Sequence, residues 1–381
     1  MKTMSNFTGA LIFILLTAFF HLSGQEKELQ AYLTYTLFDN PGGKPYIETH
    51  LMIESATAVA KTLEDGKKQV AINVQYVFSR DGKVVQYDKY TFKSPVFEGE
   101  LKNDENFLDQ RRYALENGKY EFSIEISDAN NPDGRKIVTD VPLVVDFPEG
   151  KISVSGIELI ESILPADKNE NMWTKAGHKL IPYMFSFYPN TVNKLTFYAE
   201  IYNTDKEAGE DFLLKYYVKD TDTRRIVPYL SKFEKMKAQT IIPVLRQFDI
   251  SELPSGNYSL NIEVRNKENQ LTGFNSIDIV RSNPAKDNLA SLLSAANFAT
   301  RIDDADELAD ILKSMMPIAS EIEQKTILSL SRMKKVEEMQ NFLYDFWFSR
   351  YGLKAEPEFN RYREMVVFVN DEFSTQTKKR L

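Results

Sequence analysis

One segment of the chain, Leu115–Ile126, returns later as Leu253–Val264, so that every matched position is displaced by 138 residues, from 115 to 253. In each copy a glycine lies at a turn, and a tyrosine two residues later opens a segment of alternating polar and apolar residues. A turn that leads into such alternation is typical of a β-strand. Because the pattern recurs at a domain-sized interval, the sequence predicts two copies of one β-domain in tandem.

The repeated motif has a structural explanation. Gly118 and Gly256 give the two turns a permissive backbone. Tyr120 and Tyr258 come two residues after these glycines. At the corner of a β-sandwich, a tyrosine can bury its ring while its hydroxyl forms a hydrogen bond with the backbone. We therefore expect both tyrosines to stabilise the fold and not to bind a ligand.

Residues 25–150 are predicted to form the first antiparallel sandwich. Apolar residues occupy every second position of Gln69–Ser79, and the turn Asp81-Gly82 joins this segment to the alternating segment Val84–Phe92, which predicts a β-hairpin. The other predicted strands of this domain are Leu29–Phe38, Tyr46–Ile53, Tyr120–Ser127 and Ile137–Val145. Short strands without helical crossovers favour an immunoglobulin-like or fibronectin-like sandwich.

Residues 151–282 are predicted to form the second sandwich, and residues 283–381 a helical domain. The strands expected in the second sandwich are Lys194–Tyr202, Phe212–Val218, Arg225–Leu230, Gln239–Val244, Asn257–Arg265 and Phe274–Val280. After Pro284 the apolar spacing changes to that of a helix. Ser320 and Glu323 form a capping-box pair that predicts a helix start. The expected fold is therefore mainly β, with two tandem sandwiches followed by a small helical domain.

The helical part carries apolar and aromatic stripes at spacings of three and four residues. Such stripes usually form a core or a docking face. We expect this tail to dock on a protein partner. The side chains assigned to the docking face are Phe342, Phe346, Trp347, Tyr362 and Val366.

The same part of the chain resembles a known family. The pair Phe346-Trp347, the nearby Arg350, the segment Tyr362-Arg363 and the asparagine before Phe373 are similar to the opening half of the GWxTD domain, a family of exported bacterial envelope proteins. The resemblance covers only the C-terminal helices and implies an envelope setting. It implies no catalytic residues. The defining Gly-Trp-x-Thr-Asp segment does not follow Phe373, so either this member has lost it or the chain is truncated.

The N-terminus predicts export. Lys2, the apolar segment Leu11–Phe20 and the small residues that end at Gly24 predict a signal peptide at residues 1–24. The apolar segment is too short to span a bilayer comfortably, and no later segment contains about 18 consecutive apolar residues, so we expect no transmembrane span after cleavage. A retained N-terminal anchor is the alternative. An anchor through a lipid-modified cysteine is excluded because the chain has no cysteine.

Composition and motifs exclude several kinds of chemistry. Without cysteine there is no thiol catalysis and no thiolate metal site, and a net charge of −8 gives no electrostatic reason to bind nucleic acid. Only His50 and His178 remain as histidines after the signal peptide, and His50 is expected on the face of a strand. The chain has no nucleophile elbow, phosphate loop or zinc-protease motif, and the loop Asp128–Gly134 lacks the glycine of a calcium loop. We therefore assign no catalytic, cofactor-binding or metal-binding residue.

Two hypotheses for the function follow. The favoured one is a non-enzymatic, exported cell-envelope protein, periplasmic or associated with the outer membrane, in which the sandwiches act as scaffold or binding modules and the helical tail docks on a protein partner. An outer-membrane or secretion-related assembly is the expected setting. The alternative is a periplasmic hydrolase of glycans or peptides with carboxylates at the cleft between the sandwiches.

Overall fold

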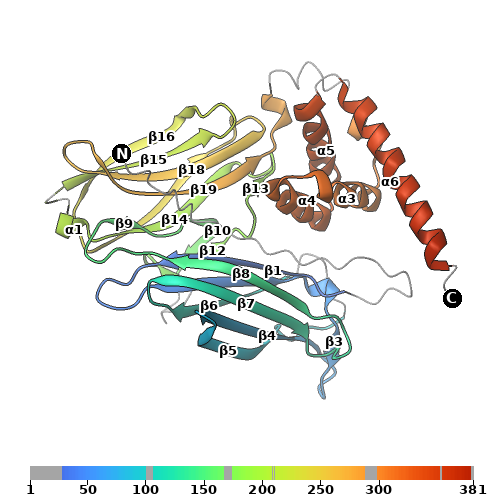
Figure 1. Cartoon of the computed structure of the whole chain (residues 1–381), viewed down its shortest axis with the longest axis horizontal. Helices are drawn as coiled ribbons and strands as arrows, with labels where there is room; N and C mark the ends of the chain where they lie inside the picture. The colour runs from blue at the N-terminus through green and yellow to red at the C-terminus, as the bar shows by residue number, and fades with distance from the viewer. Residues whose placement is uncertain are drawn as a thin grey trace.

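The computed structural model describes residues 28–99, 106–166, 174–207, 209, 211–287, 298–351 and 354–378. The predicted signal peptide lies outside these ranges, as do residues 288–297 near the start of the predicted helical domain. The described chain is mainly antiparallel β-sheet with a helical C-terminal part, as predicted (Figure 1). Figure 1 shows the first sandwich below the second, with the helical part beside the second sandwich.

Two sheets form the first sandwich. The strand orders are β1-β2-β6 and β3-β4-β7-β8, and β5 also pairs with β4. The strands are β1 (Ala31–Phe38), β2 (Tyr46–Ile53), β3 (Ala60–Thr62), β4 (Lys68–Arg80), β5 (Lys83–Lys93), β6 (Phe107–Ala114), β7 (Gly118–Asp128) and β8 (Ile137–Val145). The predicted hairpin between β4 and β5 is confirmed: Asp81 and Gly82 both have positive φ, 51° and 73°, as a type I′ turn requires.

Two further sheets form the second sandwich, with the strand orders β11-β12-β10-β14-β17 and β13-β19-β18-β15-β16, and β9 pairs with β14. The strands are β9 (Ser153–Val154), β10 (Glu158–Pro165), β11 (Thr174–Lys175), β12 (His178–Pro182), β13 (Phe187–Tyr188), β14 (Lys194–Tyr202), β15 (Asp211–Asp220), β16 (Ile226–Lys237), β17 (Ile241–Asp249), β18 (Gly256–Arg265) and β19 (Leu271–Arg281). Each sandwich encloses its own apolar core.

The repeated turn occupies the same place in both sandwiches. Tyr120 is buried and its hydroxyl donates to the carbonyl of Glu116 at 2.7 Å, and Tyr258 is buried and donates to the carbonyl of Pro254 at 3.1 Å. Each hydroxyl thus links the strand by a hydrogen bond to the turn that precedes it. The structural role predicted for the two tyrosines is confirmed.

The helical part follows the second sandwich. Its helices are α3 (Ala305–Ser314), α4 (Glu321–Met333), α5 (Val336–Tyr351) and α6 (Ala355–Lys378). Helix α1 (Thr204–Glu207) lies within the second sandwich. Short 3₁₀ helices along the described chain are η1 (Ser55–Thr57), η2 (Pro284–Lys286), η4 (Phe298–Arg301) and η5 (Met316–Ile318). The predicted capping box is confirmed: Ser320 accepts from the backbone of Glu323, whose carboxylate accepts from the backbone of Ser320 at 2.8 Å.

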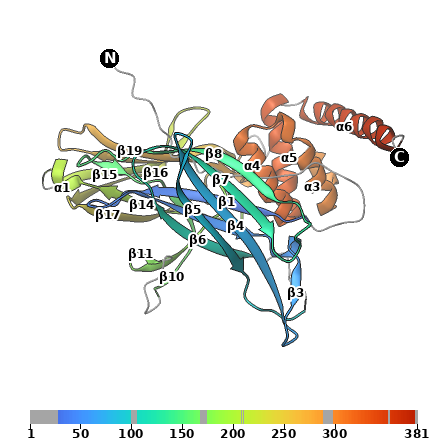
Figure 2. The ribbon, with the colours of Figure 1, turned by 60° about the horizontal axis from the view of Figure 1, so that its bottom comes forward.

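The helical part packs on both sandwiches. Phe187 and Val280 of the second sandwich belong to its apolar core. Arg332 of α4 reaches the first sandwich, where its guanidinium lies 4.9 Å from the centre of the Tyr32 ring. In two views the C-terminal half of α6 extends beyond the other helices (Figures 1 and 2). None of the described helices combines the length and the apolar character needed to cross a bilayer.

Candidate functional site

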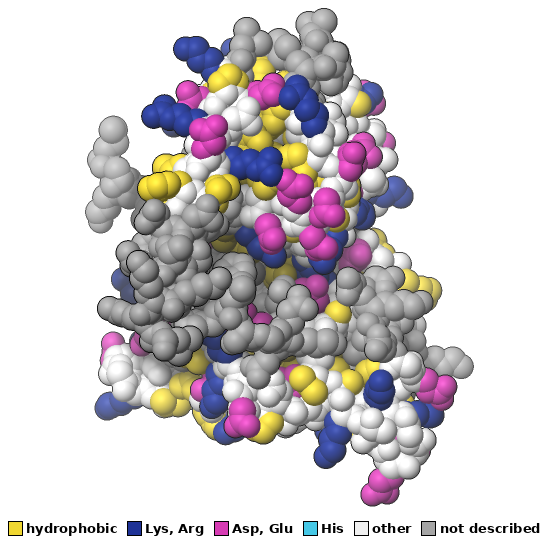
Figure 3. All heavy atoms as spheres, turned by 90° about the vertical axis from the view of Figure 1, so that its right-hand side faces the viewer, with side chains coloured by type: hydrophobic (Ala, Val, Ile, Leu, Met, Phe, Trp, Pro, Cys, Tyr) yellow, Lys and Arg dark blue, Asp and Glu magenta, His cyan; other side chains and the backbone are white. Residues whose placement is uncertain are grey.

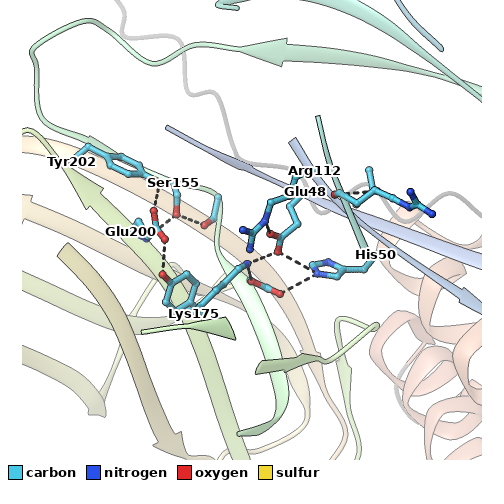
Figure 4. A network of polar contacts seen from close by, with 12 residues as sticks. Glu48, His50, Arg112, Ser155, Lys175, Glu200 and Tyr202 are labelled. Carbon is cyan, nitrogen blue, oxygen red and sulfur yellow. Dashed lines mark hydrogen bonds and ion pairs between the residues drawn. The ribbon is translucent and has the colours of Figure 1, made fainter. Parts of the chain in front are cut away.

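The outer face of the β1-β2-β6 sheet is buried against the second sandwich. In β2, Ile47 and Leu51 enter the core of the first sandwich, whereas Glu48 and His50, at the positions between, point toward the second sandwich (Figure 4). Side chains of a strand alternate between its two faces, so a strand covered on both faces shows no alternation of burial. Strand β2 is therefore buried along almost its whole length.

Apolar side chains from both sandwiches exclude water from this joint. One cluster contains Tyr32, Met52 and Met184, and the other contains Phe38, Ile160, Leu180 and Tyr198. Each cluster combines residues of β1 or β2 with residues of the second sandwich. The joint is thus an apolar region separate from the two sandwich cores and from the core of the helical part.

Charged side chains lie within this apolar joint, and we call them the joint cluster. Its members are Glu48 and His50 of β2, Arg112 of β6, Glu158 of β10 and Lys175 of β11. The Lys175 ammonium donates to Glu48 Oε1 and, at 2.6 Å, to Glu158 Oε2. Arg112 Nε donates to Glu48 Oε2. His50 Nε2 lies 3.3 Å from Glu48 Oε1 and 3.4 Å from Glu158 Oε1 (Figure 4).

The joint cluster balances its own charge. Burial opposes the ionisation of Glu48, but Lys175, His50 and Arg112 together hold the pKa of this carboxyl well below its ordinary value. Burial acts to lower the pKa of Lys175, and the carboxylates of Glu158 and Glu48 more than offset it, so that the lysine pKa is raised. Two buried carboxylates thus face the cations of Lys175, which is also buried, and of Arg112, whose side chain is 33% exposed.

A second polar network continues along the joint. Glu200 of β14 accepts hydrogen bonds from the hydroxyl of Tyr198 at 2.5 Å and from that of Tyr202 at 2.7 Å (Figure 4). Burial and the Glu200 carboxylate raise the pKa of both tyrosines above the ordinary value. The Tyr202 ring also meets Phe147 of the first sandwich edge to face, at 6.0 Å between ring centres. The two sandwiches therefore meet through polar as well as apolar contacts.

The exposure of the joint cluster limits its chemistry. The exposed fractions of the side chains are 0% for Glu48 and 5% for both Glu158 and Lys175. A glycosidase needs carboxylates that touch the sugar on both sides of the scissile bond. These two carboxylates contact Lys175 instead, and they are not open to a polymer. In the described part of the chain, the one group of side chains that could share a metal ion is Glu48, His50 and Glu158, whose ligand atoms lie within 4.8 Å of one another.

The aromatic residues predicted to form a docking face lie mostly in a core. Phe342, Phe346 and Trp347 are 6%, 3% and 2% exposed and pack inside the helical part. The docking assignment is therefore wrong for these three side chains, because α5 is covered on one side by the second sandwich and on the other by the neighbouring helices. Phe342, for example, meets the Phe187 ring edge to face at 6.5 Å.

The two remaining predicted docking residues lie on α6 and are half-buried. Tyr362 packs against the helical core, and its hydroxyl donates to the carbonyl of Ser314 at 2.7 Å. Val366 lies where α6 leaves that core. Among the side chains of α6 described up to residue 369, the exposed large apolar ones are Met365, Val367, Phe368 and Val369. The view onto the helical end shows exposed apolar side chains interspersed with charged ones (Figure 3).

The joint cluster was not predicted from the sequence. No strand was predicted at β6 or between residues 151 and 193, which are the segments that carry Arg112, Glu158 and Lys175. His50 lies on a strand face as expected, but that face is buried. The available signal was the pair Glu48 and His50, two titratable residues on one face of a strand in which most other residues are apolar.

Comparisons with known proteins do not assign a family. No protein-family model matches the sequence, and no curated protein matches it. Among solved structures, a glycosyl hydrolase family 2 member from Bacteroides cellulosilyticus aligns at 11% identity and a TM-score of 0.22, over 62% of this chain and 28% of that chain. A DUF3823 family protein from Bacteroides ovatus aligns at 12% identity and a TM-score of 0.18, over 58% of this chain and 95% of that chain.

The fibronectin(III)-like modules of Clostridium thermocellum CbhA align at 12% identity and a TM-score of 0.18, over 63% of this chain and 86% of theirs. TM-scores of this size support no inference about activity or substrate. The alignment with the glycosyl hydrolase spans less than a third of that enzyme.

Proposed function

We propose that this chain is a non-enzymatic scaffold or binding module of the bacterial cell envelope, in which two β-sandwiches and a helical part are presented to a protein partner in a fixed arrangement. The joint cluster is the observation that carries this proposal. Its two carboxylates are buried and ion-paired between the sandwiches. A catalytic pair of carboxylates would instead need contact with substrate. Such a joint holds two domains together and does not catalyse a reaction.

The energetics of buried ion pairs support a fixed joint. Separating the sandwiches would return Glu48 and Glu158 to water, which costs little for the charges themselves, but it would also expose the two apolar clusters around them. Removing a single partner from a buried ion pair costs about 3–5 kcal/mol, so the arrangement tolerates little rearrangement of its charges. The joint thus selects one relative orientation of the two sandwiches.

The envelope setting rests on the sequence. The predicted signal peptide supports export, and the resemblance of the C-terminal helices to the GWxTD domain supports a periplasmic or outer-membrane-associated place, in an outer-membrane or secretion-related assembly. The exposed apolar side chains of α6 offer a contact surface for a protein partner. Cell fractionation of the tagged full-length chain tests the location directly.

A hydrolase of glycans or peptides is the second candidate, and one observation bears on it: carboxylates from both sandwiches do meet at the joint. For these to act, the joint would have to open. We expect the purified chain to hydrolyse no member of glycan and peptide panels, and cross-linking in cells to join it to an envelope protein. Hydrolysis that Glu158→Gln abolishes, while the control Glu161→Gln on the exposed part of β10 retains it, would overturn the scaffold proposal.

A further inference from the structure

The joint cluster contains a set of donors that matches a metal site. Glu48 Oε1 and His50 Nε2 come from β2 of the first sandwich, and Glu158 Oε1 comes from β10 of the second. The His50 nitrogen lies 3.3 Å and 3.4 Å from the two carboxylate oxygens. Bonds of about 2.0–2.2 Å to a tetrahedral Zn²⁺ place neighbouring donor atoms roughly 3.3–3.5 Å apart. Both separations therefore fit edges of a tetrahedral coordination shell.

The second carboxylate oxygen of Glu48 is already positioned for such a site. Arg112 donates to Glu48 Oε2, which orients the carboxylate and leaves Oε1 toward His50. Hydrogen bonds of this kind to the outer oxygen of a ligand fix its direction and are typical around metal sites. One imidazole with two carboxylates suits Zn²⁺ better than Ca²⁺ or Mg²⁺, which prefer oxygen donors alone.

Lys175 already places a cation among these donors. Its ammonium donates to Glu48 Oε1 and to Glu158 Oε2, so it uses one of the oxygens that a metal ion would need. The lysine lies on β11, which is two residues long and pairs only with β12 at the margin of its sheet. Its side chain can therefore withdraw without moving the strands that carry the three donors.

We propose that Glu48, His50 and Glu158 form a Zn²⁺ site that joins the two sandwiches, and that Lys175 competes with the metal ion for it. With Lys175 in place, two carboxylates face two cations; replacing the ammonium by a divalent ion adds one positive charge. The exchange keeps the joint close to neutral, and Lys175 weakens metal binding without abolishing it. Because the donors are buried, the ion has a structural role. This site does not depend on whether the chain is a scaffold or an enzyme.

The test uses the full chain, stripped of metal with a chelator and titrated with ZnCl₂ by calorimetry. We expect one Zn²⁺ per chain in the wild type and a roughly tenfold or larger loss of affinity in His50→Gln and in Glu158→Gln. His178→Gln is the matched control, because His178 is exposed on β12 and takes no part in the cluster. Lys175→Met should bind Zn²⁺ at least roughly tenfold more tightly than the wild type, since the competing cation is gone.

Substitution with Co²⁺ gives a second measurement that does not need the lysine variant. We expect the intense visible absorption of tetrahedral Co²⁺ in the wild type and in His178→Gln, and its loss in His50→Gln. The proposal is overturned when neither the wild type nor Lys175→Met binds Zn²⁺, or when His178→Gln weakens binding as much as His50→Gln does.

Discussion

Lys175 holds the central position of the joint, because one ammonium group is shared by a carboxylate from each sandwich. Its Nζ also lies 4.4 Å from the centre of the Phe38 ring and 5.3 Å from that of Tyr198. Cation–π contacts of this kind gain strength where water is excluded. A single side chain of the second sandwich thus binds to groups from both sides of the joint.

Substitution of this lysine tests its contribution to stability. Lys175→Met leaves Glu48 and Glu158 buried without their shared cation, and we expect a loss of about 3–5 kcal/mol in the free energy of unfolding. Lys179→Met on the adjacent β12 is the control, because Lys179 is half-exposed and should change stability by less than about 0.5 kcal/mol. Urea unfolding in the presence of a chelator measures both. Equal effects of the two substitutions would contradict the role given to Lys175.

A second titratable residue lies between α5 and the second sandwich. Burial and, to a smaller extent, the charge of Asp287 raise the pKa of Asp345 to about 7, although a hydrogen bond with Ser255 acts to lower it. The folded state therefore holds a proton that the unfolded state has released. This stabilisation is complete below the ordinary pKa of an aspartate and is lost as pH rises toward 7.

Asp345→Asn should remove this pH dependence. The variant keeps the neutral form at all pH values, so we expect it to be more stable than the wild type by about 1–2 kcal/mol at pH 8, after allowance for solvent screening, and equal to it near pH 4. Thermal unfolding recorded between pH 4 and pH 8 provides the comparison. A difference that stays constant across that range would show that the carboxylate of Asp345 is not the group responsible.

Helices α5 and α6 differ in how they are covered, although both carry apolar stripes. Helix α5 lies between the second sandwich and the other helices, and it buries residues on nearly every side. Among the described side chains of α6, those that pack against the core lie in its N-terminal half, where Ala355 and Phe359 are 4% and 3% exposed. Beyond Val366 its described apolar side chains face solvent.

Two phenylalanines on α6 provide a direct test of this difference. Phe359→Ala should cost about 3–5 kcal/mol, because it removes a buried ring that stacks on Phe298 at 4.9 Å between ring centres. Phe368→Ala should change stability by no more than about 0.5 kcal/mol, since that ring is 65% exposed. Calorimetric melting of both variants measures the contrast. A large loss in Phe368→Ala would mean that the end of α6 is packed in solution.

At the scale of the whole molecule, the two sandwiches and the helical part form one body through three contact regions. The joint connects the sandwiches, Phe187 and Val280 connect the second sandwich to the helices, and Arg332 connects the helices to the first sandwich. Since each sandwich has its own core, loss of the joint should separate the sandwiches without unfolding either one.

Leu180→Asp tests this separation. Leu180 is 2% exposed and belongs to an apolar cluster of the joint, not to a sandwich core, so an unpaired carboxylate there should open the joint and increase the radius of gyration. Leu164→Asp on the neighbouring β10 is the control, because Leu164 is 43% exposed. Small-angle X-ray scattering measures the change, and circular dichroism verifies that the strands remain. An unaltered scattering curve for Leu180→Asp would contradict this account of the joint.

The sequence by itself determined the sandwich architecture, the corner tyrosines, the hairpin at Asp81-Gly82 and the capping box at Ser320, because alternation, turn chemistry and caps act between residues close in the chain. It also found the apolar stripes of the helices, but not which of them are covered. Only the tertiary structure decided that Trp347 is in a core and that Glu48 is ion-paired. The partners Lys175 and Glu48 are 127 residues apart, and they meet because the outer faces of two sheets pack together. No local sequence pattern predicts which outer face of a sheet another domain will cover. A site formed at such a contact can therefore be identified only in the folded chain.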